Sequence, residues 1–253
     1  MISLRYHAVS IAAVFLALAV GVVLGSSGVS DRVLAAVSTQ RDDLSAEVTR
    51  LTAERDVLAA QQRAAGEFAS RVGPAAVRGL LAGQTVALVV AGTDTADRDG
   101  VVGLIGQAGG TVTGLVELTD AVGDPARADQ LRELTSQLLP AGAANLVLVL
   151  TGGARSGVDA ADASAVYARL AAQLDLAGAG AVLAGADGSA DATGAVGVAR
   201  ADPQVAGRLS TVDDVQSGSG RVATVLALHE QLEGRAGSYG TGPRAVDGAA
   251  PAA

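Results

Sequence analysis

The feature that most constrains this chain is an uncharged apolar segment near its N-terminus. Between Ala8 and Leu24 the sequence has no charged residue and only one weakly polar residue, Ser10. A helix of this length reaches roughly 26 Å, which is the short end of what crosses a bilayer, and Gly25 and its neighbours can extend it. The segment therefore predicts one transmembrane helix, within an anchor that we assign to residues 1–29.

The charges that flank this segment set its expected orientation. Arg5 and the α-amino group precede it, and Asp31 with Arg32 follow it. The positive-inside bias favours a cytoplasmic N-terminus, with the bulk of the chain extracytoplasmic, in the cell envelope. A cleaved signal peptide is the alternative. Because this apolar region is long for a signal peptide and no A-x-A site follows it, the sequence favours an uncleaved anchor.

Small residues recur at every fourth position of the apolar segment and would line one stripe of the helix. The stripe consists of Ala13, Ala17, Gly21 and Gly25. Small side chains let a second membrane helix approach closely, so the stripe predicts a membrane-helix packing surface. Composition is the competing explanation, because Ala and Gly are abundant throughout this chain, which contains 33 Gly.

A polar segment with heptad spacing follows the anchor. Its apolar seam comprises Leu34, Val37, Leu44, Val48, Leu51 and Leu58. Leu at d positions is typical of two-stranded coiled coils, and the polar residues Arg41, Arg55 and Gln62 at a positions fix register at a cost in stability. We predict a coiled-coil stalk over residues 30–72 that forms a parallel homodimer. The alternative is a monomer whose helix folds back on its own domain or meets a different protein.

In the rest of the chain, apolar runs alternate with helical stretches. The expected strands cover residues 84–91, 111–118, 145–150, 179–186 and 195–199. The expected helices cover residues 75–82, 98–108, 126–138, 159–174 and 221–232. Continuous apolar runs such as NLVLVL are typical of parallel strands that are buried on both faces. The predicted fold class is therefore α/β, a doubly wound, mainly parallel sheet preceded by one transmembrane helix and a long coiled-coil helix.

The limits of this domain follow from two breaks in the pattern. Gly73 and Pro74 are expected to end the stalk, so the extracytoplasmic α/β domain is assigned to residues 73–233. From Gly234 onward the sequence has no periodicity. We therefore predict a flexible tail over residues 234–253.

Composition removes several classes of function. The net charge of −8 argues against a nucleic-acid partner, because a phosphate backbone requires a basic face. The chain contains no Cys, which excludes disulfides and thiol chemistry. Met1 is the only Met, and His7 and His229 are the only sources of imidazole.

A ligand in such a sheet would lie beyond the carboxyl ends of the strands. The loop that carries Gly152, Gly153 and Arg155 superficially suits an anion, but its spacing matches neither a P-loop nor a dinucleotide fingerprint. We interpret these glycines as turn residues.

Other loop residues offer little chemistry. Asp94, Asp97 and Asp187 can converge as oxygen ligands for Mg²⁺ or Ca²⁺, although acidic loop residues of an acidic protein are more often solvated. His229 lies on the last predicted helix, and the chain lacks the G-x-S-x-G elbow that would supply a serine nucleophile. His7 is expected at the cytoplasmic edge of the membrane. The sequence thus predicts no enzymatic activity, no cofactor and no metal site.

Three stretches resemble the MctB family of actinobacterial copper transporters. They are the opening MISLRYHAVSIAAVFLALAVGVVLGS, the heptad segment behind it and the late stretch STVDDVQSGSGRVATVLAL. The most telling parts are Ile2–Gly25 and Ser210–Leu228, with GSYG at 237–240 as a weaker third. The resemblance covers nearly the whole chain. It implies a cell-envelope protein that acts in copper homeostasis and forms a channel through which copper leaves. The resemblance also implies a second role, ascribed to relatives, which is the regulation of septal cell-wall hydrolases through the coiled coil.

The side chains that the sequence offers bear on whether this protein binds or conducts copper itself. Cu(I) prefers thiolate and thioether ligands and Cu(II) prefers imidazole, but the outer part offers only His229. One membrane helix lines a conduit only within an oligomer. Two hypotheses follow: an envelope protein of copper efflux, and a non-catalytic scaffold that binds an envelope protein partner in cell-wall remodelling or septation.

Overall fold

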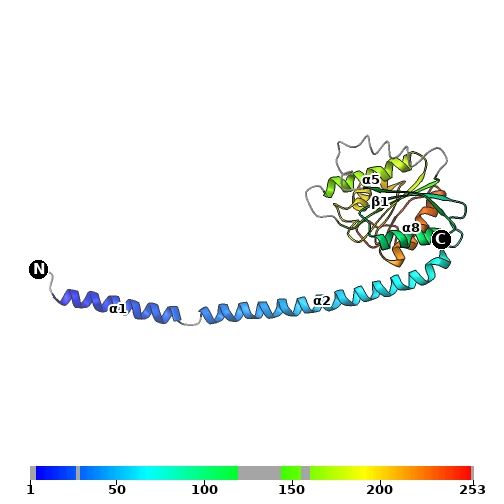
Figure 1. Cartoon of the computed structure of the whole chain (residues 1–253). Coiled ribbons are helices and arrows are strands. Elements are labelled where there is room, and N and C mark those ends of the chain that lie inside the picture. The colour runs from blue at the N-terminus through cyan, green and yellow to red at the C-terminus, as the bar shows by residue number, and fades with distance from the viewer. Residues whose placement is uncertain (1–3, 27–28, 119–143, 155–159, 252–253) are drawn as a thin grey trace. The chain divides into compact units, whose positions relative to one another are not determined.

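The computed structural model describes residues 4–26, 29–118, 144–154 and 160–251 (Figure 1). The chain divides into two compact units, Met1–Gln61 and Gln62–Ala253. The described residues of the first unit are helical, and the second unit contains the sheet with its covering helices.

Helix α1 (Leu4–Ser26) contains the predicted membrane segment. Its stretch Arg5–Val23 has a mean hydropathy of 2.2, and none of this stretch is buried within the protein. Among the described helices, α1 alone is long and apolar enough to cross a membrane. The expectation of one apolar N-terminal helix is confirmed.

Helix α2 (Val29–Ala76) is 48 residues long and extends from the first unit into the second. The expectation that Gly73 and Pro74 end this helix is wrong, because Pro74 lies inside its last turn. The Val77 N–H donates to the Gly73 carbonyl at 2.9 Å, so helical hydrogen bonding continues past the proline. Pro74 cannot donate to the Ser70 carbonyl and its ring crowds that carbonyl, and the helix ends two residues later, at Ala76. Turns, and not the helix expected over 75–82, then lead to the first strand.

Among the described residues of the second unit, six parallel strands form one sheet in the order β2-β1-β3-β4-β5-β6. The strands are β1 (Thr85–Ala91), β2 (Thr111–Leu118), β3 (Leu146–Thr151), β4 (Gly180–Gly185), β5 (Ser210–Val212) and β6 (Ser238–Tyr239). The helices are α3 (Thr95–Gln107), α5 (Ala160–Leu176), α6 (Ala195–Ala201), α7 (Pro203–Ala206) and α8 (Gly218–Leu232). The predicted α/β class with a mainly parallel sheet is confirmed.

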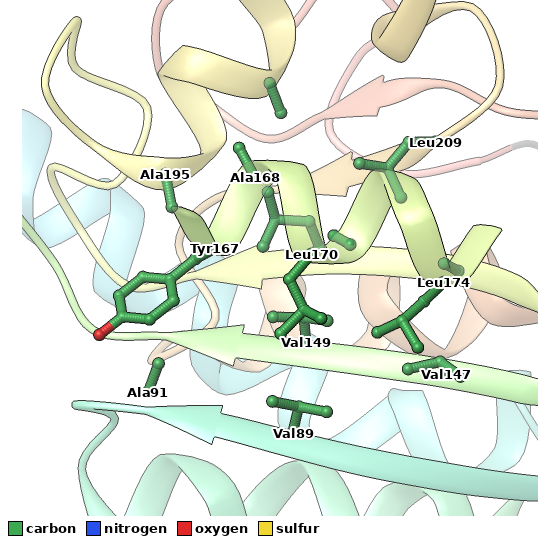
Figure 2. Packing of buried hydrophobic residues seen from close by; sticks show 14 of the residues in the cluster. Val89, Ala91, Val147, Val149, Tyr167, Ala168, Leu170, Leu174, Ala195 and Leu209 are labelled. Atoms are coloured by element: carbon green, nitrogen blue, oxygen red, sulfur yellow. The ribbon is translucent and has the colours of Figure 1, made fainter. Parts of the chain in front are cut away.

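Both faces of the sheet are covered by helices, as its apolar strands require. On one face α5 and α6 pack on β1, β3 and β4, and Figure 2 shows Leu170 and Leu174 of α5 directed at Val147 and Val149 of β3. On the other face α3 and α8 pack around Leu148. Figure 1 shows α5 and α8 on opposite sides of β1.

The predicted elements differ from the structure at two places, and a third prediction cannot be compared with it. Residues 195–199 form helix α6 and not a strand. A short apolar run has no periodicity that separates a buried strand from a buried helix, and here the small side chains of α6 pack against α5. Strand β5 was not expected, because it is only three residues long and two of them, Ser210 and Thr211, are polar. The helix expected over 126–138 lies outside the described residues.

The expectation of a flexible tail from residue 234 is also wrong. Ser238 and Tyr239 form β6, which pairs in parallel with β5, and the side chain of Tyr239 is buried. Side chains distant in sequence hold this segment, so a sequence without local periodicity is nevertheless folded.

Candidate functional site

The carboxyl edge of the sheet contains a topological switch point between β1 and β3. The chain leaves β1 toward α3 on one face, whereas β3 leads to α5 on the other face. In open α/β sheets ligands bind in the crevice that such diverging loops leave. A cavity of about 250 Å³ lies at this position, and we call it the switch-point cavity. It is lined by Ala91, Gly92, Thr151, Gly152, Gly153, Ala154, Ser164, Tyr167 and Ala195.

The described lining of the switch-point cavity is polar but uncharged. Thr151, Ser164 and Tyr167 contribute hydroxyl-bearing side chains that are at most 3% exposed. In Figure 2 the hydroxyl of Tyr167 points past the carboxyl ends of the strands, close to Ala91. These groups can exchange hydrogen bonds with a small ligand, but they include no carboxylate or imidazole for acid–base chemistry.

Gly152 and Gly153 reach this cavity, yet their missing side chains are explained by neighbouring loops. A Cβ on Gly152 would collide with the carbonyl oxygen of Gly92, and one on Gly153 with that of Asp187. The glycines therefore let three loops approach one another closely. Arg155, the third residue of the candidate anion loop, lies outside the described residues.

The three aspartates considered as ligands for a hard cation do not converge. Asp94 caps α3 by accepting from the Ala96 N–H at 2.8 Å, and Asp97 pairs with Arg221 at 2.9 Å. Asp187 instead lines a separate cavity of about 340 Å³ near the ends of β4 and β5. Within the described ranges no three His, Asp or Glu side chains are grouped to hold a metal ion.

This second cavity, which we call the acidic cavity, was not foreseen. Four carboxylates line it: Asp187, Asp191, Asp213 and Asp214. Thr241, Gly242 and Pro243 of the tail complete its wall. Sequence reasoning missed the cavity because that tail was expected to be flexible.

Asp214 is the unusual member of this set. It is 8% exposed and has φ 66°, a left-handed conformation that few residues other than Gly adopt. Burial raises the pKa of the Asp214 carboxyl, and the charges of Asp213 and Asp187 raise it further, while bonds from Ser217 and Gln62 lower it in part. Burial and like charge both disfavour the ionised form.

The end of helix α2 packs against the turn that carries Asp214. A Cβ on Gly218 would collide with the Ser70 hydroxyl and the Gly66 carbonyl oxygen, and one on Gly73 would collide with Val222. The last turns of α2 thus approach the start of α8 with no room for larger side chains. We call this contact between residues 62–76 and residues 214–222 the α2 joint.

The residues expected to pack membrane helices lie on one face of α1, where Gly21 and Gly25 have open space beside them. Ala13 and Ala17 are exposed on the same helix. The seam residues lie on α2, and five of them, Val37, Leu44, Val48, Leu51 and Leu58, are each at least half exposed. The side chain of Leu34 lies outside the described residues. No contact among the described residues covers the small residues of α1 or the apolar seam residues of α2.

The two histidines have no catalytic setting in the described structure. His229 is partly buried, and its Nδ1 lies 3.0 Å from the Leu80 carbonyl oxygen, which it must face as an N–H donor. His7 is exposed on α1.

Comparison with known proteins gives one consistent match. A family model described as Copper transport outer membrane protein, MctB matches residues 1–145 and 139–249. The Copper transporter MctB of Mycobacterium tuberculosis (strain ATCC 25618 / H37Rv) is 37% identical, with 97% of this chain and 98% of that protein covered. The protein of the same name from Mycobacterium leprae (strain TN) is 35% identical, with 96% and 97% covered. The chain therefore belongs to the MctB family.

Proposed function

We propose that this protein is a membrane-anchored protein of the cell envelope that acts in copper homeostasis. The observation that carries the proposal is the match to curated copper transporters over 96–97% of this chain. The match includes the apolar helix, the long helix and the α/β unit together. The proposed role is therefore assigned to the whole chain and not to one of these parts. The exposed helix α1, with a mean hydropathy of 2.2, supports its membrane attachment.

The proposed mechanism does not place copper in a dedicated site of the α/β unit. Copper sites in proteins favour thiolate, thioether or imidazole ligands. In the described part of the second unit only His229 could serve, and its Nδ1 already faces a backbone carbonyl. We infer that the α/β unit has a non-enzymatic role, in assembly or in partner binding, and that any copper conduit is built where several copies or a partner meet at the membrane.

A deletion strain tests the proposal directly. Loss of the gene is expected to raise intracellular copper, measured by elemental mass spectrometry, and to lower the copper concentration that stops growth. The wild-type chain should restore both, whereas residues 30–253 without the anchor should restore neither, although they retain the α/β unit. Unchanged copper content and tolerance in the deletion strain would contradict a role in copper homeostasis.

A second candidate function is a coiled-coil scaffold that acts on cell-wall hydrolases or septation. The row of exposed apolar residues on α2, from Val37 to Leu58, favours it, because a long polar helix with such a row requires a partner helix in water. Deletion should then disturb septation at ordinary copper levels, and Leu51→Asp should reproduce the defect. The two functions separate cleanly if one phenotype appears without the other.

The orientation of the chain is part of the proposal. A cytoplasmic N-terminus would place the α/β unit in the envelope, where a protease added to intact protoplasts can reach it. Protection of the α/β unit in intact protoplasts, with cleavage only after lysis, would place it in the cytosol instead and would remove both candidate functions.

A further inference from the structure

The switch-point cavity brings together hydroxyl groups from a strand and from a helix. Thr151 lies at the end of β3, whereas Ser164 and Tyr167 are three residues apart on α5 and so share one face of that helix. All three side chains are at most 3% exposed. Figure 2 shows the ring of Tyr167 between Ala195 and Ala91, which also line the cavity. A molecule in this cavity would therefore meet hydroxyls from both elements at once.

Two of these hydroxyls have hydrogen-bonding capacity to spare. The Ser164 hydroxyl bonds to no residue that the structure describes, although its side chain is 2% exposed. Thr151 Oγ1 donates to the Ala184 carbonyl oxygen over 3.4 Å, which is long for a hydroxyl donor. Each hydroxyl offers one donor and two acceptor positions, and buried polar groups are normally paired. A ligand with hydroxyl groups of its own would complete these bonds.

Two more buried hydroxyls lie beside the cavity. Thr93 Oγ1 and Ser189 Oγ are shielded from solvent and have no hydrogen-bond partner among the described residues. Thr93 follows the lining residue Gly92 in the chain. A Cβ on Gly185 would collide with Ser189 Oγ and would come within 2.8 Å of Thr151 Oγ1, so the Ser189 hydroxyl lies directly beside Thr151. Unpaired hydroxyls from the loops after β1 and β4 thus flank the cavity.

Charge restricts the class of ligand that the cavity can take. None of its described lining residues is charged, whereas four carboxylates line the acidic cavity, and Ala154 belongs to the walls of both. A cation would bind in the acidic cavity instead, and an anion would be repelled by its carboxylates. An apolar molecule would leave the hydroxyls without partners. The lining therefore favours a neutral polar ligand.

Size restricts the ligand further. The cavity volume of about 250 Å³ is just below the roughly 300–1,000 Å³ of ordinary small-molecule pockets. It has room for about eight water molecules at the ~30 Å³ that each occupies in the liquid. This space fits one small ring that carries several hydroxyl groups.

We propose that the switch-point cavity binds a small neutral polyol of the size of one sugar ring. Hydroxyls of the ligand both donate and accept, as do those of Thr151, Ser164 and Tyr167, and the methyl groups of Ala91 and Ala195 can contact its C–H faces. The inference assigns the α/β unit a ligand of its own. It does not depend on the proposed role in copper homeostasis.

Fluorine NMR on the full chain tests the proposal, because the chain contains only three tyrosines: Tyr6, Tyr167 and Tyr239. The protein is labelled with 3-fluorotyrosine and held in micelles of a detergent without a sugar headgroup. Tyr167→Phe identifies the resonance of the cavity. Glucose, ribose and myo-inositol are the probes. We expect at least one of them to shift the Tyr167 resonance saturably, with a dissociation constant on the order of 1 mM for so small a ligand, while the Tyr6 and Tyr239 resonances stay in place.

Matched variants locate the bound polyol. Thr151→Val and Ser164→Ala each remove one hydroxyl from the lining and should weaken binding about fivefold. Both replacements suit their elements, valine the strand and alanine the helix. The control is Thr241→Val, which removes a hydroxyl from the acidic cavity and keeps the backbone N–H that donates to Asp213. It should bind the polyol as the wild type does.

Three results would overturn the proposal. The first is that none of the three polyols shifts the Tyr167 resonance saturably up to about 100 mM, a hundredfold above the expected constant. The second is that inorganic phosphate or calcium shifts this resonance and the polyols do not, which would make the cavity an ion site. The third is that Thr151→Val and Ser164→Ala bind as tightly as the wild type, or that Thr241→Val loses as much affinity as they do.

Discussion

Arg200 and Asp213 form an ion pair in the interior of the α/β unit, with Nη1 and Oδ2 2.7 Å apart and both side chains at most 5% exposed. The pair also binds the C-terminal segment that contains strand β6. Arg200 donates to the carbonyl oxygens of Tyr239 and Pro243, at 2.7 Å and 3.0 Å, and Asp213 accepts from the backbone N–H of Thr241 and Gly242. Each charge therefore bonds to backbone groups of strand β6 and of the loop that follows it.

Removing one member of this pair should release the tail. Arg200→Met leaves the Asp213 carboxylate buried without its cation, which costs about 3–5 kcal/mol. We expect a loss of this size in the free energy of unfolding, measured with denaturant. Trypsin should also cleave faster after Arg235 and Arg244, which flank β6.

The double variant Arg200→Met/Asp213→Leu separates two roles of the pair. A buried ion pair that acts only between its own charges can often be replaced by apolar residues without loss. Here the backbone groups of the tail would remain unpaired, so the double variant should stay as unstable as Arg200→Met. Recovery of stability in the double variant would show that the tail does not depend on these bonds.

The hydroxyl of Tyr239 donates to both carboxylate oxygens of Glu230 on α8, at 2.9 Å and 2.7 Å. Burial first, and then Glu230, raise the pKa of the Tyr239 hydroxyl well above its ordinary value, so it stays an O–H donor at physiological pH. Tyr239→Phe leaves the buried Glu230 without this donor and should destabilise the fold by about 1–3 kcal/mol. Thermal unfolding checks the loss, and Glu230→Gln, which keeps an acceptor for the tyrosine, should cost less.

Asp175 should oppose folding at neutral pH although it pairs with Arg208. Burial raises its pKa, and this effect outweighs the bond from the Ala181 N–H and the Arg208 guanidinium, whose Nε lies 3.5 Å away. A raised folded-state pKa means that the ionised carboxylate is less stable in the folded chain, and the penalty disappears as pH falls through that pKa.

Asp175→Asn should therefore raise the free energy of unfolding at pH 7, by less than about 1 kcal/mol because solvent screens this partly exposed group. The difference from the wild type should shrink toward pH 4. Denaturant unfolding at both pH values measures it, with the exposed Asp191→Asn as control. A variant that is less stable than the wild type at pH 7 would show that the ion pair with Arg208 stabilises the fold by more than burial of the carboxylate destabilises it.

Gly218 should tolerate no side chain at the α2 joint. An added Cβ meets the Ser70 hydroxyl and the Gly66 carbonyl oxygen, so Gly218→Ala should destabilise the protein by about 1–3 kcal/mol through overpacking. The matched control is Gly103→Ala within α3, where a Cβ meets nothing within 4 Å. That variant should stabilise the helix by about 0.5–1 kcal/mol, because alanine loses less backbone entropy than glycine.

Leu44 tests the proposed pairing of α2 between two copies. Leu44→Asp places a charge in the seam and should reduce crosslinked dimer of the full chain in micelles at least severalfold, since charged residues at d positions are costly. Thr49→Asp adds the same charge at a position outside the seam and should leave crosslinking unchanged. Equal crosslinking in wild type and Leu44→Asp would exclude the seam as the dimer contact.

Local sequence was sufficient to predict those elements whose helical or extended structure depends on their own residues. The uncharged run from Ala8 to Leu24 is long enough for a helix by itself, and the apolar runs that became β1, β3 and β4 were recognisable because they are buried on both faces. Strand β2 was found at its observed bounds. In each case the pattern is repeated within one segment, so no distant contact is needed to interpret it.

Strand β5 could not be recognised in this way. Ser210 and Thr211 are fully buried although they are polar, because Gln231 donates to the Ser210 hydroxyl and Arg200 donates to that of Thr211. These donors lie 21 and 11 residues away in the chain. A short segment that begins with two polar residues is typical of a loop unless such donors are known to reach it.

The sequence by itself determined the apolar N-terminal helix, the long second helix, the α/β class and the absence of thiol chemistry, because each depends on composition or on a repeat within one segment. Only the tertiary structure decided that α6 is a helix, that the tail adds a strand, and that Asp187, Asp213 and Asp214 share one cavity. The physical reason is that burial and pairing of these residues depend on partners far along the chain. Asp214 and Gln62, for example, are 152 residues apart and meet only when the sheet and helix α2 are both in place.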